Sequence, residues 1–227
     1  MPFDAAWFDE LRGLSEEKLQ VTRERGIGAF VPHIGELCRD GYLTTRFVEE
    51  TENFVSLMSK TPYRMDTFFR AYERHVVNFP KGRAFRKQWN IAFNAGETPE
   101  EDYVRVGIGF RLCQRESEYV TGVEEYLEFR EQVRLRPAAF DGVFRKLGNY
   151  YEIDGEAQSG LSLAGTPDGD LSRIVIADQP SLDCWRFYGK RLLVSKPDDL
   201  AVICSHELLR DAAVDVFGQI RNAGFGM

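Results

Sequence analysis

The feature that most constrains this fold is a long alternation of apolar residues over residues 104–112. The apolar positions are Val104, Val106, Ile108, Phe110 and Leu112. Side chains of a β-strand point alternately to its two faces, so this period of two predicts a strand with one apolar face. The positions between them carry Arg105, Gly107, Gly109 and Arg111. We therefore expect a sheet whose second face is basic. At the glycines, this face would let the backbone of a nucleic acid or of another protein approach closely.

Other segments repeat the same period over shorter lengths. Residues 89–94 alternate Trp89, Ile91 and Phe93 with polar or small residues, which predicts a half-buried strand that pairs antiparallel with residues 104–112. Apolar runs also predict strands over residues 150–153, 171–177 and 184–194. The turn-rich residues 154–170 between them predict a loop.

The remaining segments have helical spacing, with apolar residues three and four positions apart. This spacing predicts helices over residues 4–25, 35–59, 63–78, 122–148 and 199–222. Asp40-Gly41 interrupts the second of these, and Pro137 divides the fourth, because proline lacks the backbone N–H that a helix interior requires. Helices and strands in mixed order predict an α+β fold, with a helical N-terminal lobe packed on a mainly antiparallel sheet of about four to five strands with flanking helices.

The length and the N-terminus limit the organisation of the chain. Its 227 residues fit one large domain or two small ones. We expect a helical lobe over residues 1–82 and a sheet domain over residues 83–227, with one continuous domain as the alternative. The first residues carry acids where a signal peptide has positive charge, and no apolar run has the length of a membrane span. We therefore predict a cytoplasmic protein without membrane contact.

One segment differs in charge from the rest of the chain. Residues 60–87 hold eight Lys and Arg against Asp66 and Glu73, so they net +6, whereas the chain total of −7 leaves −13 for the remainder. Aromatic residues lie between these cations. Guanidinium groups pair with phosphate and exposed rings stack on bases, so we predict a nucleic-acid-binding protein, of DNA or RNA, from a DNA-processing or defence system. The predicted phosphate contacts are Arg64, Arg70, Arg74, Arg83, Arg86, Lys87, Arg105 and Arg111.

Two other functions remain open at this stage. Asp168, Asp170 and Asp178 could hold Mg²⁺ and activate water in a phosphodiesterase or nuclease, against the simpler interpretation of an ordinary acidic turn. A protein-interaction or small-ligand module is favoured by the negative total charge, which repels nucleic acid. Tyr151 and Trp185 are candidates for one pocket that holds a flipped base, although aromatic residues more often fill a core. The residues predict neither an oligomeric state nor a cofactor other than Mg²⁺.

Overall fold

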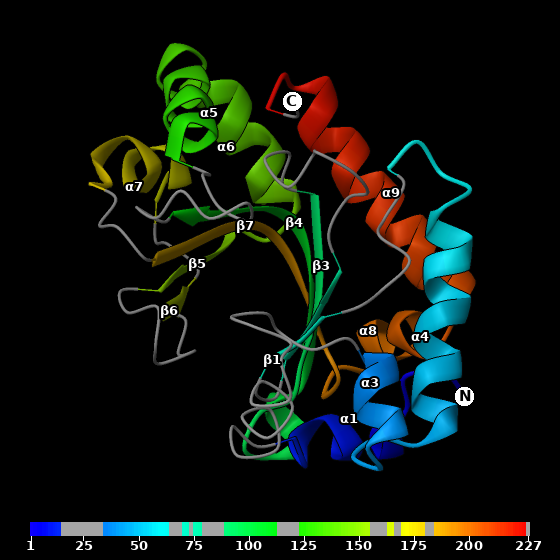
Figure 1. The fold of residues 1–227 in the computed structure, drawn as a ribbon. Helices are drawn as coiled ribbons and strands as arrows, with labels where there is room; N and C mark the ends of the chain where they lie inside the picture. The colour runs from blue at the N-terminus through cyan, green and yellow to red at the C-terminus, as the bar shows by residue number, and fades with distance from the viewer. Residues whose placement is uncertain are drawn as a thin grey trace. The chain divides into compact units, whose positions relative to one another are not determined.

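The computed structural model describes residues 1–14, 34–63, 70–72, 75–78, 89–112, 123–154, 163–165, 169–179 and 184–225. Helices and strands follow one another in mixed order along these residues (Figure 1), and the expected α+β class is confirmed. The chain forms two compact units. The first comprises Met1–Lys81, Ile91–Arg105 and Leu192–Val214, and the second comprises Gly82–Asn90, Val106–Arg191 and Asp215–Met227.

In the described part of the chain, seven strands form one sheet in the order β1-β2-β3-β4-β7-β5-β6. Their bounds are β1 (Arg70–Tyr72), β2 (His75–Asn78), β3 (Trp89–Asn94), β4 (Tyr103–Leu112), β5 (Tyr150–Asp154), β6 (Leu163–Gly165) and β7 (Cys184–Leu193). The pairs β1–β2, β2–β3, β5–β6 and β5–β7 are antiparallel. The sheet is therefore mainly antiparallel, as we expected, with more strands than the sequence indicated.

The first unit holds the N-terminal helices. They are α1 (Ala5–Arg12), α3 (Ile34–Arg39) and α4 (Thr45–Met58), with α8 (Pro197–Ile203) and the first part of α9 (His206–Asn222). Asp4 accepts a hydrogen bond from the backbone N–H of Trp7 at 3.2 Å, which caps the start of α1 as the sequence predicted. Trp7 stacks on Phe47 of α4, with ring centroids 4.3 Å apart, and Phe3 contacts Phe93 of β3 at 4.5 Å. Aromatic side chains therefore join α1, α4 and β3.

The second unit holds α5 (Val123–Leu135), α6 (Pro137–Lys146) and α7 (Leu171–Ala177), which pack on one another (Figure 1). Pro137 begins α6, where its missing N–H costs nothing, so the expected division at this residue is confirmed. Phe129 of α5 packs between Phe110 of β4 and Tyr188 of β7, at centroid distances of 5.0 and 5.5 Å. Phe225, just after α9, contacts Phe129 at 6.3 Å. We call the covered side of β4 and β7 the helix face.

The expected helix over residues 63–78 is wrong. Its described residues form β1 and β2, a hairpin in which Arg70 pairs with Val77 and Tyr72 with His75. The apolar residues of this segment fit both periods, and β-branched Val76 and Val77 suit a strand. Pairing of β2 with β3 decides between them, because the hydrogen bonds of the sheet outweigh a weak helical preference.

The expected strand over residues 171–177 is also wrong, because this segment forms α7. Leu171 and Val175 are buried at helical spacing, and a short apolar run does not by itself distinguish the two structures. Asp141 of α6 supplies the deciding contact. Its carboxylate accepts hydrogen bonds from the backbone N–H of Ser172 at 2.8 Å and from the Ser172 hydroxyl at 2.6 Å. A carboxylate at the first turn satisfies free N–H groups and favours a helix.

Further expectations need correction. Residues 89–94 form a strand, but both faces of β3 are buried, so it is not half-buried. The last helix is divided into α8 and α9, which are separated at Cys204 and Ser205. The expected loop over residues 154–170 contains the short strand β6, and the described part of the helix expected over residues 4–25 ends at Arg12. The expected strands over 104–112, 150–153 and 184–194 are confirmed as β4, β5 and β7.

Candidate functional site

Most of the predicted phosphate contacts are not described by the structure. Arg64, Arg74, Arg83, Arg86 and Lys87 lie outside the described residues. Arg70 is placed by its backbone in β1, and Arg111 by its backbone in β4. Arg105 is the one whose side chain is described, and it is only 6% exposed. Arg105 is therefore covered in this fold and does not present its charge to a polyanion in solvent.

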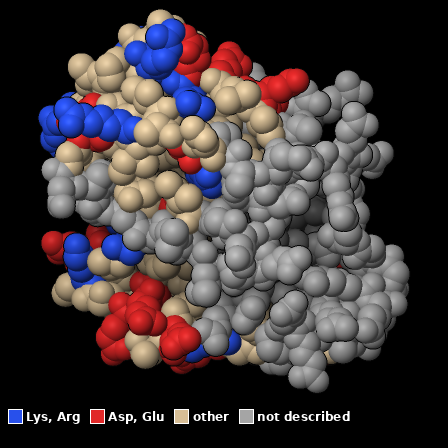
Figure 2. Space-filling model, turned by 90° about the vertical axis from the view of Figure 1, so that its left-hand side faces the viewer, with Lys and Arg blue, Asp and Glu red and all other residues tan. Residues whose placement is uncertain are grey.

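The described arginines are largely paired with acids. Figure 2 shows a face on which the described Lys and Arg side chains lie among Asp and Glu side chains. Ion pairs with carboxylates are made by Arg12, Arg39, Arg46, Arg134, Arg145, Arg186 and Arg210. Paired charges of both signs produce little net field at a distance. Among the described residues, most arginine charges are therefore paired with carboxylates.

The three predicted acids do not meet. Asp168 lies outside the described residues, whereas Asp170 and Asp178 flank the two ends of α7. A helix of this length separates its ends by about 10 Å, too far for both carboxylates to bind one ion. Asp170 pairs with Arg145 at 3.0 Å. Among the described residues, no group of three or more His, Cys, Asp or Glu side chains is placed to hold a metal.

Asp178 instead belongs to a buried network on the helix face. Its carboxylate accepts two hydrogen bonds from Arg186 of β7, one from Nε at 2.8 Å and one from Nη2 at 3.0 Å. The Tyr126 hydroxyl donates a third hydrogen bond to the same carboxylate. The hydroxyls of Tyr126 and Tyr188 are 3.1 Å apart. Burial raises the pKa of Tyr126 far above its ordinary value, and Tyr188 and Asp178 add to the shift. This network joins α5, α7 and β7 and is satisfied within the protein.

The two residues of the predicted base pocket lie on opposite faces of the sheet. In the β5–β7 register, Tyr151 is opposite Tyr188, and Tyr188 belongs to the helix face. Trp185 is opposite Asp154 on the other face, because side chains alternate along a strand. A single pocket on this pair of strands therefore cannot include both Tyr151 and Trp185.

We call this other side of the second unit's sheet the polar face, defined by Asn90, Tyr150, Glu152, Trp185 and Arg191. Trp185 lies across Gly109, where an added Cβ would be 2.6 Å from its ring. Phe187 covers Gly107 and Gly189 in the same way, at 2.9 and 3.0 Å. The glycines of β4 therefore admit aromatic rings of this same chain, not the external backbone that we expected from the sequence.

Opposite charges meet at the β5 end of the polar face. The Tyr150 hydroxyl donates a hydrogen bond to the carboxylate of Glu152, which is wholly buried. The Arg191 guanidinium lies over the Tyr150 ring, 4.7 Å from its centroid, in cation–π geometry. A carboxylate, a hydroxyl and a guanidinium therefore share one small area.

Asn90 lies on the β3 strand of the polar face. The neighbouring Trp89 packs on Phe217 of α9 at 4.9 Å, so Asn90 points to the opposite side of the strand. Its exposed fraction is 0%, and neither its Oδ1 nor its Nδ2 has a hydrogen-bond partner in the part of the chain that the structure describes. A buried amide with both polar atoms unsatisfied is rare in native proteins. No sequence pattern indicated this residue, because asparagine also fits a solvent-facing strand position.

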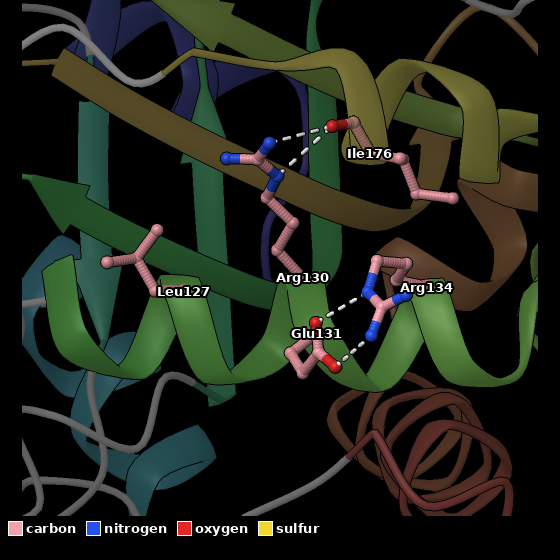
Figure 3. A pocket seen from close by; sticks show the side chains of 5 residues that line it. All are labelled: Leu127, Arg130, Glu131, Arg134 and Ile176. Carbon is pink, nitrogen blue, oxygen red and sulfur yellow. Dashed lines mark hydrogen bonds and ion pairs between the residues drawn. The ribbon is translucent and has the colours of Figure 1, made fainter.

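A pocket of about 230 Å³ lies between α5 and α7 in the second unit (Figure 3). Leu127, Arg130, Glu131 and Arg134 line it from α5, and Ile176 lines it from α7. Arg130 donates from Nε and Nη2 to the carbonyl of Ile176, at 3.1 and 2.9 Å. This contact satisfies a carbonyl in the last turn of α7. The positive charge of Arg130 also stabilises this C-terminal end of the helix.

Comparison of the chain with protein-family models, with curated proteins and with solved structures finds no match in any of the three. Within the described ranges, none of the helices has the length and apolar composition of a membrane span. A functional assignment therefore depends on the geometry of this chain alone.

Proposed function

We propose that this chain is a small-ligand-binding module and that its binding surface is the polar face of the second unit. The observation that carries this proposal is Asn90, an amide that is wholly buried and has no hydrogen-bond partner among the described residues. Leaving a buried donor or acceptor unsatisfied costs about 1–3 kcal/mol, so a residue kept at this cost serves a purpose other than stability. Binding of a polar ligand would satisfy it.

The other residues of the polar face suit such a ligand. Glu152 places a buried carboxylate and Arg191 a guanidinium on the same face. Trp185 adds a partly exposed ring on the same face. Pockets for small molecules commonly combine aromatic walls with a few fixed polar groups. The ligand class that follows is a small polar molecule with both hydrogen-bond donors and acceptors.

Asn90→Leu tests this proposal, because leucine keeps the branched shape but has no polar atoms. We expect a raised midpoint of urea unfolding together with lost binding. Binding is measured by calorimetry with AMP, CMP, glutamate and arginine as probes. At least one probe should bind the wild type and weaken by about tenfold or more in the variant, the loss expected for an amide hydrogen bond. A lowered unfolding midpoint, or equal binding by both proteins, would show that Asn90 is a structural residue.

Nucleic-acid binding is a second candidate, and what favours it is the charge of residues 60–87, which net +6 in a chain of −7. Its test is the charge reversal of Arg70, Arg74 and Arg86 to Glu. We expect the wild type to bind single-stranded DNA or RNA with an affinity that falls steeply with salt, and the variant to lose this binding. The matched control reverses Arg39, Arg134 and Arg210, which are paired with acids, and should bind as the wild type does. Equal weak binding by all three proteins would remove this candidate.

A further inference from the structure

We propose that the pocket between α5 and α7 binds a small carboxylate with a short aliphatic stem. This site is separate from the polar face, because it lies on the helices, and it does not depend on the function proposed above. The pocket measures about 230 Å³. Pockets for drug-sized ligands measure about 300–1,000 Å³, so a smaller ligand is expected here.

The positive side of the pocket consists of two guanidinium groups that are already held in position. Arg130 is fixed through Nε and Nη2 to the Ile176 carbonyl, and Arg134 is fixed through Nε and Nη2 to Glu131, at 2.7 and 2.6 Å. Among the described residues, no hydrogen bond involves Nη1 of either arginine. A guanidinium has five N–H donors, so both retain donors for an anion.

The charges that line the pocket favour an anion over a cation. The lining contains two arginines and one acid, Glu131. The hydrogen bond with Arg134 lowers the pKa of Glu131, so Glu131 is ionised at neutral pH. The lining thus carries one net positive charge. A carboxylate matches the planar donors of arginine better than other small anions of single charge do.

The apolar side of the pocket explains the aliphatic stem. Leu127 is 47% exposed, and Figure 3 shows it on one side of Arg130 with Ile176 on the other. Arg130 lies between Leu127 of α5 and Ile176 of α7, so a short chain whose carboxylate binds Arg130 could pack against Leu127. Covering Leu127 would remove apolar surface from water.

The test uses hexanoate and hexanamide, which have the same length but differ in charge. NMR chemical-shift titration of the labelled protein should show millimolar binding of hexanoate, with shifts in α5 and α7, and at least tenfold weaker binding of hexanamide. Equal shifts with both compounds, or shifts that avoid α5 and α7, would overturn the proposal.

Two variants of the pocket and one control outside it test whether the ligand binds here. Leu127→Glu places a carboxylate against the ligand and should abolish hexanoate binding. Leu135→Glu is its matched control on the same helix, since Leu135 is 59% exposed and does not line the pocket. Both leucines face solvent, so neither change should unfold the protein. Loss of binding in both leucine variants, or in neither, would contradict the site. Arg134→Gln should weaken binding about tenfold, and unchanged affinity would also contradict it.

Discussion

Two largely buried polar side chains, Asp178 on the helix face and Asn90 on the polar face of the second unit's sheet, differ in how they are satisfied. On the helix face, the carboxylate of Asp178 receives Arg186 and Tyr126, and the hydroxyl of Tyr126 also meets Tyr188. On the polar face, the amide of Asn90 has no such partner among the described residues. Arg186 and Tyr188 come from β7 and Asn90 from β3, two strands of the same sheet.

This contrast distinguishes Asp178, which stabilises the fold, from Asn90, to which we assign a role in binding. The Asp178 carboxylate on the helix face has several partners, so this fold can accommodate buried polar groups. We propose that the unsatisfied amide on the same sheet marks a site where another requirement outweighs stability. The variants below test this comparison, beginning with the largest expected effect.

Asp178→Ala should have the largest effect on folding. Removal of this carboxylate leaves Arg186, whose side chain is 4% exposed, as a buried charge without its partner. Breaking a buried ion pair in this way costs about 3–5 kcal/mol, measured as the loss in free energy of urea unfolding. Asp170→Ala at the other end of α7 is the control. Its pair with Arg145 is exposed, so we expect about 0–1 kcal/mol. Similar losses in the two variants would mean that the network does not hold the helix face together.

Gly107→Ala should have the next largest effect. The added Cβ would lie 2.3 Å from the backbone oxygen of Tyr188 and 2.7 Å from the Cα of Gly189, and neither atom can move without shifting β7. Overpacking of this kind costs about 1–3 kcal/mol in unfolding free energy. Gly142→Ala is the matched control, because nothing lies within 4 Å of its added Cβ in α6. Removal of a helical glycine should stabilise the protein by about 0.5–1 kcal/mol. A stable Gly107→Ala protein would show that the polar face is not closely packed against its own rings.

Asn90→Leu should change stability in the opposite direction. We expect a gain of about 1 kcal/mol in unfolding free energy, because the desolvation penalty of the amide disappears while some overpacking remains. Thr51→Val in the first unit is the control. The Thr51 hydroxyl is buried and donates to the carbonyl of Val48 at 2.8 Å, so its removal should not stabilise. If both substitutions lower stability, the contrast between the two faces fails.

The smallest effect at neutral pH concerns the ionisation of Tyr126. Because burial raises its pKa above the ordinary value of 10.0, the unfolded chain loses this proton at a lower pH than the folded protein. The contribution of the protonated Tyr126 to the free energy of unfolding is therefore complete below about pH 10. Above that pH it decreases by about 1.4 kcal/mol per pH unit. Tyr126→Phe should reduce the slope of unfolding free energy between about pH 10 and pH 11 by that amount. Identical slopes for the two proteins would mean that Tyr126 ionises normally.

Sequence patterns predicted the elements that depend on nearby residues. The alternation from Val104 to Leu112 predicted β4, and Pro137 predicted the division between α5 and α6. Periodicity and proline act within a few positions of the chain, so one sequence is enough to recognise them. The same reasoning failed at residues 70–78 and 171–177, where the local pattern suits both helix and strand.

The candidate sites were predicted less well from the sequence than the helices and strands. Asp178 was a candidate metal ligand, yet it pairs with Arg186, and Tyr151 and Trp185, the candidates for one pocket, lie on opposite faces of the sheet. Asn90 and the pocket at Arg130 were not predicted at all. Nothing near Asn90 in the sequence reveals whether its amide will be covered, or by what.

The sequence by itself determined the α+β class, the strand β4 and the break between α5 and α6, because these follow from the spacing and type of side chains along the chain. Only the tertiary structure decided which face each polar group occupies and what satisfies it. Tyr126 and Asp178 are 52 positions apart, and Asp141 caps α7 from 31 positions away. Such partners are chosen by how the sheet pairs and the helices pack, and that choice depends on the burial of the whole chain.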